Sequence, residues 1–236
     1  MTERGQKHIQ RSAQHFRIGP SSLHWNGETL TIDIDEINVP LPKRVRGRIT
    51  VKPEGLSTFV TSLDNEGRHR WGPIAPCSRV HVKMDDPNLD WHGHAYMDAN
   101  EGDEPVEEGF KDWDWARCEM ANGDTTVVYD VRPQIGPNRI IAQRFTRSGN
   151  HTPFTAPKRH TMPASGWRIA RGMCNDVNEP PTIVSTLEDT PFYARSLLRT
   201  TLLGEEVTAM HESLDIPRLV SLPVRLMLPW RMPRRA

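Results

Sequence analysis

The stretch Ser22-Leu-His-Trp-Asn-Gly-Glu-Thr-Leu-Thr-Ile-Asp-Ile-Asp35 carries the clearest structural signal in the chain. Its Asn26-Gly27 dipeptide is typical of the turn of a β-hairpin. After this turn Leu30, Ile32 and Ile34 alternate with polar residues, which gives a strand one buried face and one solvated face. The stretch therefore predicts two antiparallel strands.

The same alternation recurs along the chain and predicts a mostly β protein. Further strands are expected at 44–51, 79–84, 91–100, 110–120, 125–131, 139–145, 166–172, 182–187, 192–198 and 206–212. A second hairpin turn is expected at Asn122-Gly123. Residues 146–165 are rich in Pro, His, Thr and Gly and predict a long loop. A short N-terminal helix is expected over Thr2–Phe16, because Ile9, Ala13 and Phe16 would share one side of it.

Many short antiparallel strands with turn signals favour a closed or nearly closed barrel, or a sandwich. The best position for a domain boundary is near 133–137, which would give an N-terminal β domain over 1–132 and a C-terminal β domain over 133–236. A single continuous sheet system is the alternative to this division.

The composition excludes some classes of partner. The 236 residues include 30 Lys and Arg and 30 Asp and Glu, so the net charge provides no field for nucleic acid. Three scattered cysteines, Cys77, Cys118 and Cys174, predict buried reduced thiols and a cytoplasmic protein. No segment reaches the roughly 20 apolar residues of a spanning helix. The basic, apolar end at 214–236 is expected either to pack over the fold or to lean on a membrane surface.

The segment Trp91-His-Gly-His-Ala-Tyr-Met-Asp-Ala-Asn100 would be an unusual strand. With a period of two, titratable and aromatic side chains share one face, namely His92, His94, Tyr96, Asp98 and Asn100. Trp91 falls on the other face with Gly93, Ala95 and Met97. A face of this kind predicts a pocket wall that holds a proton donor among aromatic rings.

A second group, His69 and Trp71, lies two residues apart and so points the same way on a strand. Together with Tyr96 and Asp98 it suits the protonation of a carbon–carbon double bond. Such a step needs an acid in an apolar pocket, aromatic rings that steady a carbocation, and a group that directs water. Trp113 and Trp115 are expected to line the cavity and, with Trp91 and His94, to bind the substrate.

Other interpretations of these residues remain open. A Tyr-x-Asp on a strand is most often a structural hydrogen-bonded pair, and Trp71 could belong to the core. His69, His92 and His94 could instead bind zinc, although no fourth ligand is evident. A nucleophile elbow, a phosphate-binding glycine loop and a dinucleotide fingerprint are all missing, which disfavours a hydrolase, a kinase or a Rossmann dehydrogenase.

With these residues in view, the chain resembles the carotenoid 1,2-hydratases, or hydroxyneurosporene synthases, of phototrophic bacteria. The resemblance rests on the tryptophan-rich block at 91–102 and 113–117, and on weaker pieces at 1–5, 18–25, 63–76 and 228–234. Members of the family typically extend further before the segment that matches Met1, so the chain is expected to be N-terminally shortened.

The resemblance implies a lipocalin-like architecture of two packed calycin-like domains. It also implies cofactor-free and metal-free addition of water across the terminal 1,2 double bond of an acyclic carotene such as neurosporene or lycopene. Asp98 would correspond to the proton donor, and Tyr96, His69 and Trp71 to its functional neighbours. The expected partners are the carotenoid, water and a membrane surface to which the protein attaches peripherally.

Two other functions compete with this interpretation. A non-catalytic calycin that carries pigment or lipid would have a cavity lined only by apolar groups. A related cyclase or isomerase would act on another polyene, and neighbouring genes for carotenoid desaturation or methylation would favour the hydratase over it.

Overall fold

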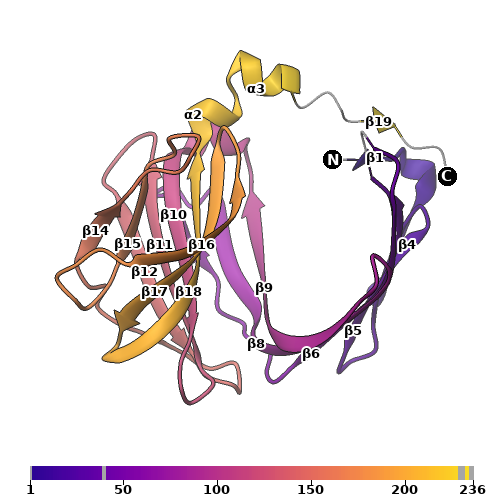
Figure 1. Cartoon of the computed structure of the whole chain (residues 1–236), viewed down its shortest axis with the longest axis horizontal. Helices are drawn as coiled ribbons and strands as arrows, with labels where there is room; N and C mark the ends of the chain where they lie inside the picture. Colours follow the sequence, from indigo (N-terminus) through magenta and orange to yellow (C-terminus); the bar gives the residue numbers. More distant parts are fainter. Residues whose placement is uncertain (1, 39–40, 228–231, 234–236) are drawn as a thin grey trace.

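The computed structural model describes residues 2–38, 41–227 and 232–233, and antiparallel strands dominate it (Figure 1). One large sheet has the order β2-β3-β4-β5-β6-β8-β7, and β9 pairs with β8. Its strands are β2 (Ile9–Arg11), β3 (His15–Ile18), β4 (Ser21–Trp25), β5 (Leu30–Ile37), β6 (Arg44–Pro53), β7 (Thr61–Ser62), β8 (His69–Asp86) and β9 (Leu89–Gly102). This sheet curves strongly away from the rest of the molecule (Figure 1).

The second large sheet has the order β13-β12-β11-β10-β18-β17-β16. Its strands are β10 (Phe110–Glu119), β11 (Thr125–Pro133), β12 (Arg139–Phe145), β13 (His151–Pro153), β16 (Thr182–Asp189), β17 (Tyr193–Leu202) and β18 (Glu205–Asp215). Two further pairs are β14 (Arg159–Met162) with β15 (Arg171–Cys174), and β1 (Thr2–Glu3) with β19 (Met232–Pro233). The helices are short: a 3₁₀ turn (Gln6–His8), α1 (Val106–Gly109), α2 (Ile216–Leu219) and α3 (Leu222–Met227).

The mostly β prediction is confirmed, and the sheets pack as a sandwich. In the part of the chain that the structure describes, neither large sheet closes into a barrel. The proposed domain boundary at 132/133 falls at the last residue of β11, and β11 and β12 are hydrogen-bonded neighbours in the second sheet. The change from one sheet to the other occurs earlier, between β9 and β10. The division into domains at 132/133 stays a prediction.

Both predicted hairpins are confirmed. β4 and β5 pair antiparallel from Trp25 opposite Leu30, and Asn26 Oδ1 accepts hydrogen bonds from the backbone N–H groups of Glu28 and Thr29. The connection is therefore a four-residue loop in which Gly27 takes a φ of +98°, a left-handed value that favours glycine. β10 and β11 join around Asn122-Gly123 through residues 120–124, where Asn122 Oδ1 accepts a hydrogen bond from the backbone N–H of Asp124.

The helix predicted over 2–16 is wrong except for the single turn at Gln6–His8. Ile9–Arg11 and His15–Ile18 instead form a hairpin, in which Ser12 Oγ accepts a hydrogen bond from the backbone N–H of His15. The sheet satisfies the backbone groups of this segment through β4, so tertiary pairing overrides a weak helical spacing.

Two further predictions in the C-terminal half are wrong in part. The expected loop at 146–165 contains the strands β13 and β14, and the strand expected at 166–172 is displaced to Arg171–Cys174.

The end of the chain forms α2 and α3, while 228–231 and 234–236 lie outside the described residues. No helix among the described residues is both long enough and apolar enough to span a membrane. All three cysteines are free and buried, as predicted.

The main core lies between the two sheets. Its buried members include Trp71 from β8, Phe110 from β10, and Val127, Tyr129 and Val131 from β11. A second core covers the other face of the second sheet, where Cys118, Val128 and Leu198 meet Met162 and Met173 of the β14–β15 pair. β10 and β11 are thus buried on both faces.

Charged groups are also buried on that second face. Asp114 Oδ2 accepts hydrogen bonds from Arg132 Nη2 at 2.9 Å and from Arg159 Nη2 at 2.7 Å, while Asp130 Oδ2 accepts from the same two guanidinium groups at 2.8 Å each. Asp114 Oδ1 accepts from Ser213 Oγ at 2.5 Å. Burying these charges is tolerable because each carboxylate is paired and hydrogen-bonded. The cluster fixes β10 against β11 and β14.

Candidate active site

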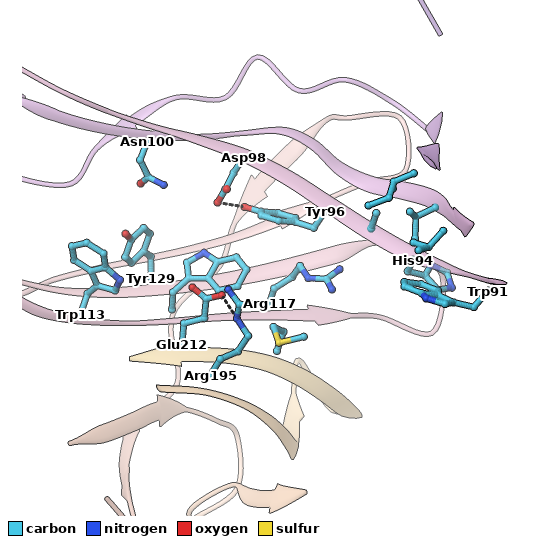
Figure 2. Close-up of a pocket in the computed structure, with 16 residues that line it drawn as sticks. Trp91, His94, Tyr96, Asp98, Asn100, Trp113, Arg117, Tyr129, Arg195 and Glu212 are labelled. Atoms are coloured by element: carbon cyan, nitrogen blue, oxygen red, sulfur yellow. Dashed lines mark hydrogen bonds and ion pairs between the residues drawn. The ribbon is translucent and has the colours of Figure 1, made fainter. Parts of the chain in front are cut away.

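An open pocket of about 590 Å³ lies where the two large sheets face each other. Figure 2 shows that residues of β9 line one side of the pocket and residues of the second sheet line the other side. The lining residues are Ile49, Val80, Val82, Trp91, His94, Ala95, Tyr96, Asp98, Asn100, Trp113, Trp115, Arg117, Tyr129, Arg195, Met210 and Glu212.

Asp98 is held by two hydrogen-bond donors on the same oxygen. Its Oδ2 accepts from Trp71 Nε1 at 2.8 Å and from the Tyr96 hydroxyl at 3.1 Å. The pairing of β8 with β9 places Trp71 opposite Asn100 and Pro73 opposite Asp98, so the indole reaches the carboxyl diagonally. Oδ1 has no hydrogen-bond partner within the described residues. The carboxyl is thus anchored at one oxygen only.

Aromatic rings surround this carboxyl. The Tyr96 ring lies 5.4 Å from Trp115, and Tyr129 lies 5.5 Å from Trp71 and 6.0 Å from Trp113, measured between ring centroids. Trp113 and Trp115 are two residues apart on β10, so both face the pocket, whereas Asp112 and Asp114 face the ionic cluster. The indole N–H of Trp115 is buried and has no acceptor in the described part of the chain.

Charged side chains of the second sheet line the wall of the pocket that faces β9. The Arg117 guanidinium lies 5.6 Å from the centroid of the Tyr96 ring, and burial lowers the pKa of Arg117. Arg117 makes no ion pair with a carboxylate among the described residues. Arg195 Nε donates to Glu212 Oε1 at 3.0 Å and forms a neutral pair at the base of the pocket.

Burial also controls the tyrosines. It raises the pKa of Tyr96 well above the ordinary value, and the neighbouring Asp98 carboxyl raises it further. Burial likewise raises the pKa of Tyr129 and of Tyr193. The Tyr96 phenol therefore keeps its proton at neutral pH and remains a donor to Asp98.

His69 lies apart from Asp98 in a second cavity of about 320 Å³. Its ring packs 4.7 Å from the Phe110 ring, and its Nε2 lies 3.4 Å from Glu104 Oε1. Neither of these two atoms has a hydrogen-bond partner within the described residues, although both are buried. Asn100, Trp113 and Tyr129 line both cavities, so the two spaces adjoin.

The predicted faces of β9 hold only in part. Trp91 and Ala95 line the same pocket as Tyr96 and Asp98, and His92 does not line it. The reason is an irregular register: Pro73 pairs with Asp98 but Ser78 with Ala95, which leaves two additional residues on β8. A bulge of this kind twists the strand and redirects its side chains.

His94 lies at the rim of the pocket between two charged partners. Arg79 Nη1 donates to its Nε2 at 2.7 Å, so the proton is on Nδ1, which lies 2.9 Å from Glu119 Oε1. His69, His92 and His94, the histidines considered as zinc ligands, are not brought together in the part of the chain that the structure describes. The zinc interpretation of these three residues is therefore wrong.

The structure adds residues that sequence analysis missed. Tyr129, Arg195, Met210 and Glu212 line the pocket from the second sheet. Arg195 and Glu212 are directly opposite on β17 and β18. Opposite charges at polar positions of two predicted neighbouring strands were the available signal, but only the register shows that they meet.

Comparison with known proteins shows the family to which the chain belongs. The sequence profile described as "Carotenoid hydratase CrtC" matches residues 1–236. The chain is 56% identical over 236 residues to an acyclic carotenoid 1,2-hydratase of Rubrivivax gelatinosus and 48% identical over 235 residues to that of Thiocapsa roseopersicina. The two alignments include 100% and 99% of the chain, respectively. The chain spans 58% of the length of each of these two relatives. An acyclic carotenoid 1,2-hydratase of Cereibacter sphaeroides is 33% identical over 236 residues, with 84% of its length covered. The chain belongs to the carotenoid hydratase family.

Proposed function

We propose that this protein adds water to the terminal 1,2 double bond of an acyclic carotenoid and that Asp98 is the acid. The observation that carries the proposal is the carboxyl with two donors on one oxygen, Trp71 and Tyr96, inside an aromatic pocket. The family's named activity supports it. Because the Trp71 N–H and the Tyr96 O–H both donate to Oδ2, the transferable proton belongs on Oδ1.

The reaction balances with side chains and water alone. The π electrons of the double bond take the Oδ1 proton of Asp98 to form a C–H bond at C-2, which leaves positive charge on the tertiary C-1. The two donors stabilise the carboxylate left on Asp98. Water then attacks C-1 and releases a proton, which returns to the carboxylate, and the product is a tertiary alcohol. Addition of water is redox-neutral.

The charges in the pocket suggest where the reacting end lies. A pocket of about 590 Å³ takes a drug-sized molecule, so it would hold one end of a long polyene. Positive charge on C-1 is disfavoured near Arg117 and favoured near the rings of Trp113 and Tyr129, each worth about 0.5–2 kcal/mol. We therefore place the chain entry beside Trp91, which is 47% exposed, and the reacting end beside Asp98 on the side of Trp113 (Figure 2).

We also propose that water arrives through the second cavity. His69 and Glu104 hold buried polar atoms without hydrogen-bond partners in the described part of the chain, which suits a site that water occupies. Asn100 lies at the junction of the two cavities. In this scheme His69 orients water and does not touch Asp98.

Incubation with lycopene or neurosporene in D₂O tests the two roles separately. The parent protein should give a product heavier by one D₂O. Asp98→Asn should give neither alcohol nor deuterium exchange. His69→Gln should still exchange deuterium into unreacted polyene while it makes less alcohol, because protonation is retained and capture is impaired. Alcohol formation by Asp98→Asn at the parent rate would refute the acid assignment.

A pigment-carrying function without chemistry is disfavoured by the polar groups in the pocket. Such a protein is expected to have an apolar lining, whereas Asp98, Arg117, Arg195 and Glu212 all line this pocket. Binding of lycopene without any alcohol product would favour that alternative.

We further propose peripheral attachment to a membrane, on its cytoplasmic side. The support is α3, where Leu222 and Leu226 are 69% and 64% exposed and share one side of the helix. Exposed leucines near basic residues such as Arg225 are typical of an interfacial segment. Flotation with anionic vesicles tests this, with Leu222→Ser/Leu226→Ser as the variant expected to stay behind. Equal flotation of both proteins would contradict it.

A further inference from the structure

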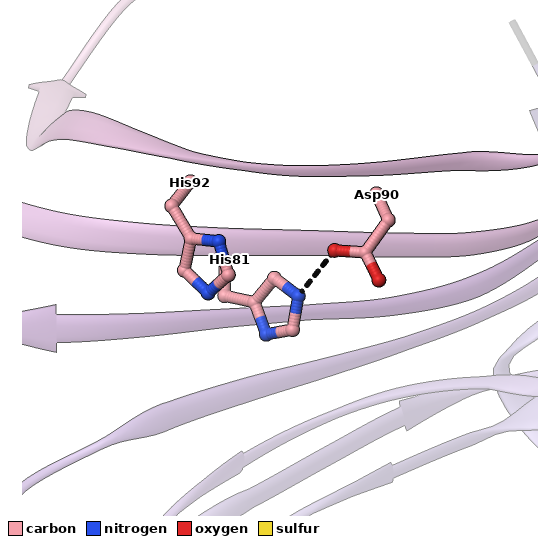
Figure 3. Close-up of side chains that lie close together, drawn as sticks. All are labelled: His81, Asp90 and His92. Carbon is pink, nitrogen blue, oxygen red and sulfur yellow. Dashed lines mark hydrogen bonds and ion pairs between the residues drawn. The ribbon is translucent and has the colours of Figure 1, made fainter.

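His81, Asp90 and His92 form a cluster on the exposed side of the β8–β9 pair (Figure 3). His81 and His92 are directly opposite in the register, and Asp90 is two residues from His92, so all three point from the same side of the sheet. His81 Nε2 lies 2.8 Å from Asp90 Oδ1, and the two imidazole rings stack with centroids 3.9 Å apart. One ligand atom from each of the three residues lies within 4.8 Å of the others.

Two imidazole nitrogens and one carboxylate oxygen are the ligand set of open zinc sites, in which water completes the coordination. The ligands here come from two hydrogen-bonded strands, so the backbone already holds the three side chains together. This reduces the conformational entropy that binding would otherwise cost. The ring planes are 10° from parallel, so one ring must turn about its Cβ–Cγ bond to share an ion with the other. His92 and Asp90 are exposed and His81 is half-buried, which leaves room for that rotation.

We propose that His81, Asp90 and His92 bind one divalent transition-metal ion of the zinc type. The bound ion would cross-link β8 and β9, the strands that carry Trp71 and Asp98. This proposal is independent of the hydratase function, because its readouts are binding and stability. The alternative is a purely structural histidine pair with one hydrogen bond.

The chain contains a matched control. His15 and His24 are also directly opposite on paired strands, but their rings are 6.3 Å apart and tilted by 56°. They are not part of any three-residue metal cluster among the described residues. If two directly opposite histidines were sufficient to bind zinc, both pairs in the described part of the chain would bind it.

The test is titration of the chelator-treated full chain with Zn²⁺ by calorimetry, together with thermal unfolding with and without Zn²⁺. We expect one ion at this site, binding weakened by at least about tenfold in His92→Ala and in Asp90→Asn, and unchanged binding in His24→Ala. Zinc should raise the Tm of the parent and of His24→Ala but not of His92→Ala.

Absence of binding by the parent would overturn the proposal, as would equal affinities of parent and His92→Ala. Unchanged affinity in Asp90→Asn would overturn the three-ligand site. Asp90→Asn keeps the shape of an exposed side chain, so it reports on the site even if His92→Ala proves unstable.

Discussion

Replacement of Tyr96 by phenylalanine isolates one hydrogen bond of the proposed acid. It deletes the hydroxyl that donates to Asp98 Oδ2 at 3.1 Å and keeps the ring against Trp115 and under Arg117. A hydrogen bond to a charged group is worth about 1.5–3 kcal/mol. This bond is longer than the 2.8 Å bond from Trp71, which remains, so we take the lower part of that range. About 1.5–2 kcal/mol corresponds to a loss of about 13- to 30-fold in kcat/KM.

The assay is steady-state formation of the alcohol from lycopene or neurosporene, with the fold checked by circular dichroism. Tyr129→Phe is the matched control, because it deletes the same atom in the same pocket from a residue that makes no hydrogen bond to Asp98. We expect a smaller loss for Tyr129→Phe than for Tyr96→Phe. Equal rates for Tyr96→Phe and the parent would refute the role of the donor. An inactive parent chain would instead count against the proposed function.

Asp114→Ala should lower the free energy of unfolding by about 3 kcal/mol, the low end for a broken buried ion pair because one of its two arginines keeps contact with water. A loss below about 1 kcal/mol in urea unfolding would contradict the importance of the ionic cluster. His69→Gln should slow alcohol formation by about 100-fold, and a normal rate would exclude a relay. Burial raises the pKa of all three tyrosines, so the folded protein keeps phenol protons that the unfolded chain releases. The contribution of the tyrosines to the free energy of unfolding should therefore be complete below about pH 10 and fall as the pH rises further. Tyrosinate absorbance in the folded protein above about pH 10 would contradict this prediction.

The hairpins could be predicted because their signals are local. Asn26-Gly27 and Asn122-Gly123 each stand between alternating apolar positions, and both connect paired strands. The segment 2–16 could not be predicted in this way. Its apolar spacing fits a helix, but the neighbouring strand β4 decides its structure, and that partner is invisible to a local pattern.

The candidate site could be predicted in part. Tyr96 and Asp98 share a strand and meet as expected, and Trp71 completes the group from β8. His69 lines the second cavity and not the pocket that holds Asp98. Trp91 lines that pocket because the register between β8 and β9 is irregular. Arg195 and Glu212 come from strands about a hundred residues away in sequence. Long-range register of this kind is set by packing, which a single sequence does not display.

The two faces of β10 constrain how this pocket can be engineered. Trp113 and Trp115 alternate with the aspartates of the buried charge cluster, so backbone shifts that make room for a bulkier polyene would also strain Asp114. Ile49, Val80 and Val82 line the same cavity from the curved sheet and pack instead in an apolar cluster with Leu30, Ile34 and Val45. Libraries for new substrates are therefore better aimed at these three aliphatic positions, where a change in volume carries no electrostatic penalty.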